Sequence, residues 1–158
     1  MHQHRWLIGI LLGFFVTTGC RPSSSPPPST TRQVIQTDQA PVPVGPYSQA
    51  IRTGNMLFIA GQIGLDPTTK KLVAGGIIPE TQQALENIQA ILDAAGFSKS
   101  DLVQVQIFLA DINDYAAMNK VYAAFFEGVS PPARAAVQVA HLPLDARIEI
   151  MATAVRTR

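Results

Sequence analysis

The sequence has few of the residues that form disulfides, hold metals or bind nucleic acids. It contains one cysteine, so the chain cannot form an internal disulfide and must be stabilised by its core. Of three histidines only His141 lies outside the first four residues, which argues against a zinc site. Charged residues make up 15% of the chain, its net charge is +1 and it has no long basic run. Nucleic-acid binding therefore has no electrostatic basis.

The first twenty residues read as an export signal. A basic start ending at Arg5 precedes an apolar segment, 6–16, which is shorter than the ~20 residues of a membrane-spanning helix. The segment ends in "VTTGC", and small residues before a lone cysteine resemble a bacterial lipoprotein signal. We expect residues 1–19 to be removed and Cys20 to be lipidated as the new N-terminus. An ordinary secretory signal with an incidental Cys20 is the alternative.

The next segment, 20–32, reads as a tether. Its sequence "RPSSSPPPSTTR" is dominated by proline and serine, which is typical of an extended linker. Residues 33–158 are then the folded domain, and about 125 residues suffice for one real core. The expected location is the periplasmic face of a bacterial membrane. Arg21 after the cysteine favours the outer membrane, and a protein without the lipid would be secreted or periplasmic.

The domain shows strand and helix patterns in a clear order. Helical spacing of apolar residues predicts helices over 78–96 and 111–128, the first capped by Gly96. The apolar stripe of the first helix is Ala84, Leu85, Ile88, Ile91 and Leu92, and that of the second is Tyr115, Met118, Tyr122 and Phe125. A Gly54-Asn55 turn separates two of the strand candidates. The full set of expected strands is 33–37, 47–53, 56–60, 101–110, 133–140 and 147–155. In strand 101–110, alternation places Val103 on the same face as Val105, Ile107 and Leu109. This order predicts an α+β fold in which two helices pack on one face of a mixed sheet, with the other face solvated or covered by another subunit.

Two motifs have structural explanations. The stretch "DINDY" at 111–115 lacks the glycine and terminal glutamate of a calcium loop, and helix capping by Asn113 or Asp114 explains it better. His141 reads as a histidine at a strand end. We therefore expect no metal site.

Arg134 is the unusual residue, because it interrupts an otherwise apolar strand. Alternation places Arg134 and Ala136 on the face away from the helices, with Val137 on the core face. The same rule places Glu149 on the face away from the helices. From the pattern alone, these charges are a solvated sheet surface, a cross-strand ion pair or functional groups.

The domain resembles the RidA/YjgF family of imine-handling proteins. The resemblance rests on several stretches in order: "APVPVGPYSQAI", "GNMLFIAGQIGLDPTT", "ALENIQAILDAAG", "FLADINDYAAMNKVYAAFF", "PPARAAVQVAHLP" and "RIEIMATAV". It implies a fold like that of trimeric chorismate mutase, in which three subunits form a central barrel with a cleft at each subunit boundary. It also implies hydrolysis of reactive 2-imino and enamino acids to 2-oxo acids and ammonia, without a cofactor.

The resemblance also assigns site residues. Arg134 matches the arginine that binds the substrate carboxylate, and Glu149 matches the acidic residue that activates water. The residues matching the substrate-binding positions are Tyr47, Ala60, Gly61, Asn119 and Ala136. The planar guanidinium suits a carboxylate, and a carboxylate suits proton removal from water.

Two positions differ from the family pattern. Ala60 stands where serine is frequent, and Ala136 stands where cysteine is frequent, so substrate preference and rate are the properties most affected. A module that binds or scaffolds small carboxylates in the same cleft is the alternative to an enzyme. Ribonuclease activity, known for some relatives, fits poorly with the nearly neutral charge.

Overall fold

The computed structural model describes residues 31–157. The expected export signal, Cys20 and residues 20–30 of the expected linker lie outside this range. Within it, no helix has the length and apolar character needed to cross a membrane. The main elements are β1 (Arg32–Ile35), β2 (Ala50–Thr53), β3 (Met56–Ile63), α1 (Ile77–Ala95), β4 (Leu102–Leu109), α2 (Tyr115–Phe125), β5 (Ala133–Gln138) and β6 (Ile148–Val155), with short 3-10 helices η1 (Lys99–Asp101), η2 (Ile112–Asp114) and η3 (Pro143–Asp145).

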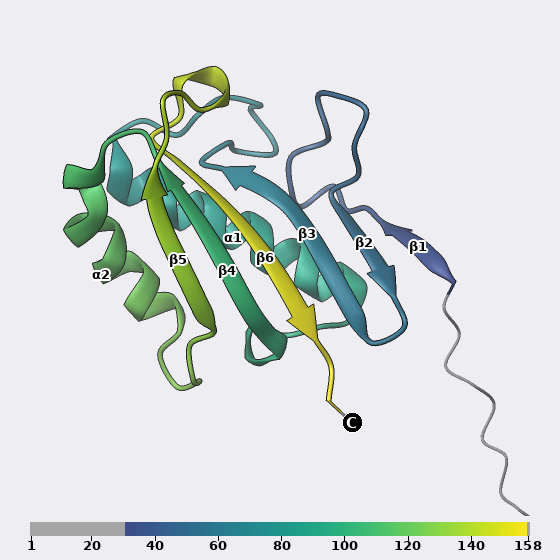
Figure 1. The fold of residues 1–158 in the computed structure, drawn as a ribbon. Coiled ribbons are helices and arrows are strands. Elements are labelled where there is room, and N and C mark those ends of the chain that lie inside the picture. The colour runs from purple at the N-terminus through teal and green to yellow at the C-terminus, as the bar shows by residue number, and fades with distance from the viewer. Residues whose placement is uncertain (1–30, 158) are drawn as a thin grey trace, which may run out of the picture.

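The strands form one six-stranded sheet in the order β1-β2-β3-β6-β4-β5 (Figure 1). Every neighbouring pair is antiparallel except β4 and β5, which are parallel and are connected through α2. Both helices lie on one side of the sheet, with α1 behind its centre and α2 beside β5. The predicted α+β fold with a mixed sheet and two helices is confirmed.

Helix α1 covers the centre of the sheet with one apolar stripe. The predicted stripe is fully buried, and its members are Ala84, Leu85, Ile88, Ile91 and Leu92. Gly96 ends the helix in a left-handed conformation at φ 72°, and its N–H donates to the carbonyls of Leu92 and Asp93, as the sequence predicts.

Helix α2 is shorter than the predicted segment, and its cap differs. The side chain of Asp111 accepts a hydrogen bond from Asn113 N and caps the short η2 turn that leads into α2. Asp114 occupies the N-cap position of α2, but its side chain makes no capping hydrogen bond, because the chain enters the helix from a 3-10 turn. Met118 and Tyr122 of the predicted stripe are buried, whereas Tyr115 is 41% exposed at the N-terminal end.

Strand β4 departs from strict alternation at its start. Its pairing with β6 shifts register between Leu102 and Gln104, so Val103 points outward and is 46% exposed. The expectation that Val103 shares the core face of Val105 is therefore wrong, since a bulge reverses the pattern for one residue.

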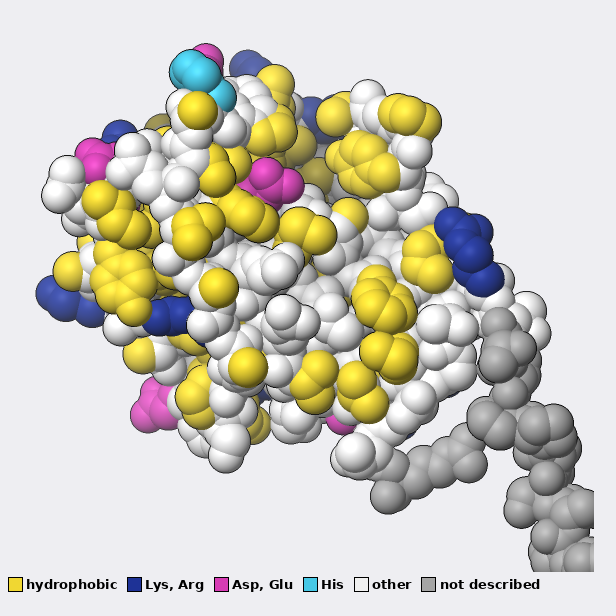
Figure 2. All heavy atoms as spheres, in the orientation of Figure 1, with side chains coloured by type: hydrophobic (Ala, Val, Ile, Leu, Met, Phe, Trp, Pro, Cys, Tyr) yellow, Lys and Arg dark blue, Asp and Glu magenta, His cyan; other side chains and the backbone are white. Residues whose placement is uncertain are grey.

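The face of the sheet opposite the helices carries apolar side chains that no element of residues 31–157 covers. Figure 2 shows yellow groups distributed across this side among polar ones. The exposed residues include Phe58 on β3, Met151 on β6 and Val137 on β5, at 44%, 38% and 47%. A monomer gains nothing from exposing such groups, so this surface has the character of an interface.

Candidate functional site

Glu149 lies on the open face of the sheet, as its sequence pattern predicts. Its chain neighbours Ile148 and Ile150 are fully buried against the helices, while Glu149 itself is partly exposed. It pairs with Ile63 on β3 and Phe108 on β4. A pocket of about 410 Å³ opens beside it, lined by Pro41, Val42, Val44, Tyr47, Gln49, Ala60, Gly61, Gln62, Ile63, Leu65, Pro143, Leu144, Glu149 and Met151.

Gly61 allows the Glu149 side chain to lie against the backbone of β3. A Cβ added to Gly61 would lie 2.6 Å from Glu149 Cδ and overlap the carboxylate oxygen. The pairing of β3 with β6 shifts register between Ile59 and Gln62, so Ala60 and Gly61 form a bulge beside Glu149. The buried Gln62 Nε2 donates to the carbonyl oxygens of Ala60 and Gly61, at 3.1 Å each, and fixes this bulge. Bulges commonly aim side chains at functional sites.

The Glu149 carboxylate has no hydrogen-bond partner or cation within residues 31–157. Partial burial in its apolar pocket raises its pKa, because desolvation disfavours the charged form. An unpartnered carboxylate with a raised pKa is suited to accept a proton from a bound water.

The loop that carries Tyr47 is held by the buried side chain of Gln49. Gln49 Oε1 accepts from Thr37 N at 2.7 Å, and Nε2 donates to the carbonyls of Thr37, Ala40 and Pro41 at 2.9–3.1 Å. These four bonds fix both ends of the loop over β3. Tyr47 is 51% exposed and lines the pocket.

Arg134 does not share the open face with Glu149. Its partner across the parallel pair β4–β5 is Val105, and Ala136 pairs with Ile107; both partners belong to the core face. Arg134 and Ala136 therefore point to the side of α2, and Val137 is the exposed residue. The predicted facing of this strand is wrong. On this edge strand, the more apolar side is the uncovered one.

Aromatic residues of α2 hold the guanidinium of Arg134. Nη2 donates to the Tyr115 hydroxyl at 2.9 Å, and Cζ lies 4.4 Å from the centroid of the Tyr122 ring and 5.6 Å from that of Tyr115. A pocket of about 400 Å³ adjoins the guanidinium, lined by Asn119, Tyr122, Ala123, Phe126, Pro131, Pro132 and Arg134. Arg134 has no carboxylate partner among the described residues, so its charge remains available for an anion.

Tyr122 is the other unusual group of this pocket. Its side chain is 5% exposed and its hydroxyl has no hydrogen-bond partner in the described part of the chain. Burial raises the pKa of Tyr122 to about 12, and the charge of Arg134 opposes this shift only in part. The ring therefore stays neutral beneath the guanidinium and supports it by cation–π attraction.

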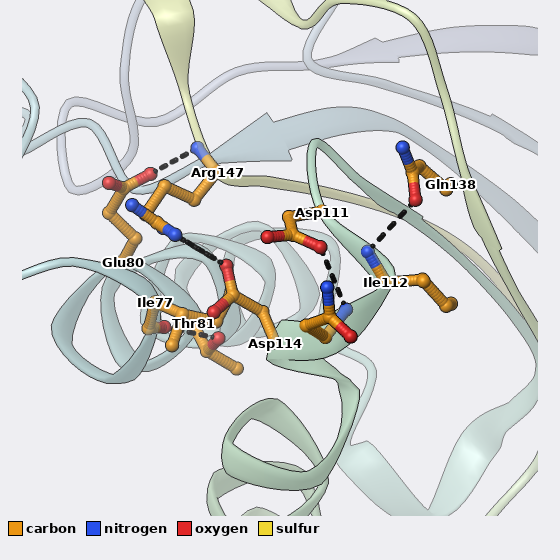
Figure 3. Close-up of polar contacts among 9 residues, drawn as sticks. Ile77, Glu80, Thr81, Asp111, Ile112, Asp114, Gln138 and Arg147 are labelled. Carbon is orange, nitrogen blue, oxygen red and sulfur yellow. Dashed lines mark hydrogen bonds and ion pairs between the residues drawn. The ribbon is translucent and has the colours of Figure 1, made fainter.

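Polar contacts fix the start of β6, two residues before Glu149 (Figure 3). The buried Glu80 accepts a hydrogen bond from Arg147 N at 2.8 Å. The Arg147 guanidinium pairs with Asp114 Oδ2 through Nε at 3.0 Å and Nη2 at 2.9 Å. These contacts tie β6 to α1 and to the turn before α2.

The structure thus divides the predicted site residues between two pockets. Tyr47, Ala60 and Gly61 line the pocket of Glu149, which we call the carboxylate pocket. Asn119 lines the pocket of Arg134, which we call the guanidinium pocket. Ala136 lines neither and packs against the core.

The two pockets are well separated within one subunit. Glu149 aligns with Phe108 on β4, which aligns with Val137 on β5, three residues from Arg134. Two strand spacings and three residues give a backbone separation of about 14 Å between Arg134 and Glu149. Since the two side chains also point to opposite faces, one small molecule cannot contact both in the same subunit.

Sequence reasoning missed three contributors to these pockets. Tyr115 and Tyr122 read as members of an apolar helix stripe, yet their contacts to Arg134 show a second role. The available signal was the phenol itself, since a purely apolar stripe has no need of hydroxyl groups. Gln49, which holds the Tyr47 loop, carried no such signal. Residues 31–157 contain no cluster of histidine, cysteine and acidic side chains fit to hold a metal.

A family model described as Endoribonuclease L-PSP matches residues 37–156. The chain belongs to the Rid family. A RutC family protein from Pyrococcus horikoshii is 57% identical over 123 residues, which cover 78% of this chain and 97% of the relative. The 2-iminobutanoate/2-iminopropanoate deaminase of Mus musculus is 48% identical over 128 residues, covering 81% and 94%.

Solved Rid structures agree with the architecture. TdcF from E. coli with bound serine superposes with a TM-score of 0.77 at 41% identity, covering 79% of this chain and 99% of that one. The YjgF gene product of E. coli gives a TM-score of 0.76 at 42% identity, covering 79% and 99%. The resemblance read from the sequence motifs is confirmed at the level of family and fold.

Proposed function

We propose that this Rid protein hydrolyses 2-imino acids to 2-oxo acids and ammonia, without a cofactor. The observation that carries the proposal is Glu149, a partly desolvated carboxylate without a partner in residues 31–157, packed against Gly61 at the edge of an apolar pocket. The names of several relatives, including the murine deaminase, support the substrate class.

We propose further that each site is completed by two copies of the chain. Arg134 and Glu149 lie in separate pockets of one subunit, but a 2-imino acid carries its carboxylate next to the carbon that water attacks. A second copy placed over the open sheet face would bring its guanidinium pocket to the first copy's carboxylate pocket. Exposed Phe58, Val137 and Met151 support burial of that face. A homotrimer with a central barrel is the assembly that the family resemblance implies.

The proposed reaction assigns one task to each group. Arg134 binds the substrate carboxylate through parallel N–H donors. Glu149 accepts a proton from water as its oxygen bonds to the C=N carbon, and the nitrogen takes up a proton to give a carbinolamine. The proton of the carbinolamine hydroxyl is then transferred to the nitrogen, the C–N bond breaks as the C=O bond forms, and ammonia leaves with the 2-oxo acid. Tyr47, Ala60, Gly61 and Asn119 shape the cleft.

The test is release of ammonia or 2-oxo acid from freshly generated 2-iminobutanoate and 2-iminopropanoate. The full chain is compared with Arg134→Ala, and light scattering records the assembly of each protein. Acceleration over buffer that the variant loses supports imine hydrolysis at this site. No acceleration by a folded, assembled parent protein rejects these substrates.

Binding without turnover is the second candidate. Ala60 supports it, because this position offers no hydroxyl to the substrate beside Glu149. The bound serine of TdcF also shows that a Rid protein can hold a small carboxylate. A parent protein that binds 2-oxobutanoate but leaves imines unaccelerated would favour this reading. An RNA substrate is not proposed, because the net charge of +1 provides no basic surface.

We also propose that the protein is exported and held at the periplasmic face of a bacterial membrane through Cys20. The matched relatives are covered almost completely by about four fifths of this chain, so its first residues are additional to a whole Rid domain. Metabolic labelling with a fatty-acid analogue, compared between the full chain and Cys20→Ala, tests the anchor.

A further inference from the structure

Arg134 is held on one side by aromatic groups and is free of anionic partners in residues 31–157. One of its five N–H groups is used by the Tyr115 hydroxyl, and the Tyr122 ring lies 4.4 Å from Cζ. The ion pair that the described residues form joins Arg147 and Asp114, so it does not involve Arg134. The remaining N–H groups are available to a ligand.

We propose that Tyr115 is a positioning residue that sets the orientation of the Arg134 guanidinium and thereby determines affinity for the substrate carboxylate. The inference rests on the proposed function, because it assigns Arg134 to carboxylate binding. Tyr115 and Tyr122 together are called the aromatic clamp. In the clamp, Tyr122 supports the plane of the guanidinium, and the Tyr115 hydroxyl prevents its rotation within that plane.

The reason for such a clamp is the flexibility of arginine. An arginine side chain has many rotamers, and a ligand that must select one of them binds more weakly. Bidentate binding also requires the two donating N–H groups to lie in the plane of the carboxylate. Contact with the Tyr122 ring alone does not fix the direction in which the guanidinium N–H groups point. The hydrogen bond from Nη2 to the Tyr115 hydroxyl fixes that direction.

The exposure of Tyr115 supports a role beyond packing. The side chain is 41% exposed, while its helix neighbour Met118 is completely buried. A phenylalanine at this position would provide the same apolar contact. The hydroxyl is therefore accounted for by its bond to Arg134 and by no other contact among the described residues.

The experiment compares the full chain with Tyr115→Phe. The variant keeps the ring and removes the hydroxyl, so circular dichroism and thermal melting should match the parent. We expect KM for 2-iminobutanoate to rise about five- to tenfold with kcat changed by less than about twofold, the effect of losing one hydrogen bond that acts in binding. Lys120→Gln, which removes an exposed cation from the same helix, is the control and should leave KM near the parent value.

A binding measurement separates this inference from the proposed function. The dissociation constant for 2-oxobutanoate, from calorimetry, should rise by the same five- to tenfold factor in Tyr115→Phe, at about the level of one hydrogen bond. An unchanged KM and dissociation constant overturn the clamp while hydrolysis by the parent stands. If the parent shows no turnover, the proposed function fails, and the dissociation constant alone decides on the clamp. A parent that neither hydrolyses imines nor binds 2-oxobutanoate overturns both, and an equal fall in kcat instead of a rise in KM overturns the positioning role.

Discussion

The carboxylate pocket and the guanidinium pocket hold their charged residue by different contacts, the first through main chain and the second through side chains. In the carboxylate pocket, Glu149 lies against the main chain of β3, and a bulge at Ala60 and Gly61 provides the space. In the guanidinium pocket, Arg134 lies against the side chains of Tyr115 and Tyr122. A substitution that disturbs a main-chain contact moves a strand, whereas a side chain can lose one atom without changing the position of the rest. The first pocket should therefore tolerate almost no substitution, and the second should respond in small steps.

Substitution of Gly61 by alanine should produce the largest effect. The added Cβ would lie 2.6 Å from Glu149 Cδ, so the carboxylate must move away from its present position. A displacement of this order costs about 100-fold in turnover, and the overpacking lowers the free energy of unfolding by about 2 kcal/mol. Imine hydrolysis and urea unfolding measure the two losses.

Gly45→Ala is the matched control for this change. A Cβ at Gly45 would lie 3.5 Å from the Tyr47 ring, an ordinary contact, and should alter the free energy of unfolding by less than about 0.5 kcal/mol. Activity of Gly61→Ala at the level of the parent would show that the packing of Glu149 against β3 is irrelevant to the reaction.

Glu149→Gln should come second, because it keeps the shape of the side chain and removes the base. Turnover should fall by about 100-fold, the lower end of the contribution of a positioned general base, without the loss of stability expected for Gly61→Ala. The dissociation constant for 2-oxobutanoate should change far less, since the proposed function assigns the main contact with the carboxylate to Arg134. Loss of binding and turnover in equal measure would assign Glu149 to ligand binding instead.

The pH dependence should report the same carboxylate. Desolvation raises the pKa of Glu149 above 4.5, so kcat/KM should fall with decreasing pH through a midpoint above that value. A raised pKa in the folded state favours the protonated form. Its contribution to stability is therefore present below pH 4.5 and is lost as pH rises through the folded-state pKa.

Stability measurements check this sign independently of activity. Glu149→Gln should melt at a higher temperature than the parent near neutral pH, and the difference should disappear in acid below the unfolded pKa. A variant that is less stable than the parent near neutral pH would mean that the carboxylate is favourably paired in the assembled protein.

Tyr122→Phe should have the smallest effect, and it should be stabilising. The hydroxyl of Tyr122 is buried and unpartnered in the described residues, while its ring carries the contact with Arg134. Removing an unsatisfied hydroxyl should raise the free energy of unfolding by about 1 kcal/mol. Chemical denaturation measures the change, and a loss of stability would reveal a bound water at the hydroxyl.

The sequence predicts the layers of this fold well, because its helices and inner strands bury one continuous stripe each. Glu149 could be placed correctly on the open face, since fully buried Ile148 and Ile150 flank it on a central strand. The family, the helix end at Gly96 and the turn at Gly54-Asn55 were likewise accessible from sequence patterns.

The facing of Arg134 could not be predicted in the same way. Strand β5 lies at the edge of the sheet, where Arg134 and Ala136 lie on the side covered by α2 and Val137 lies on the uncovered side. An alternating pattern predicts that the more apolar side of a strand is buried within its own chain. The prediction is wrong for a strand whose uncovered side carries the more apolar residues. The predicted facing of Val103 is wrong for a different reason, because a bulge shifts the register by one residue.

The division of the predicted site between two pockets has a consequence for mixtures of variants. If each working site takes Arg134 from one copy and Glu149 from its neighbour, two inactive proteins can restore each other. Unfolding Arg134→Ala together with Glu149→Gln and refolding them in equal amounts would place both native groups at about a quarter of the subunit boundaries. The refolded mixture would then hydrolyse imines although each of its two variants is inactive alone. A mixture of the two folded variants that do not exchange subunits would remain inactive.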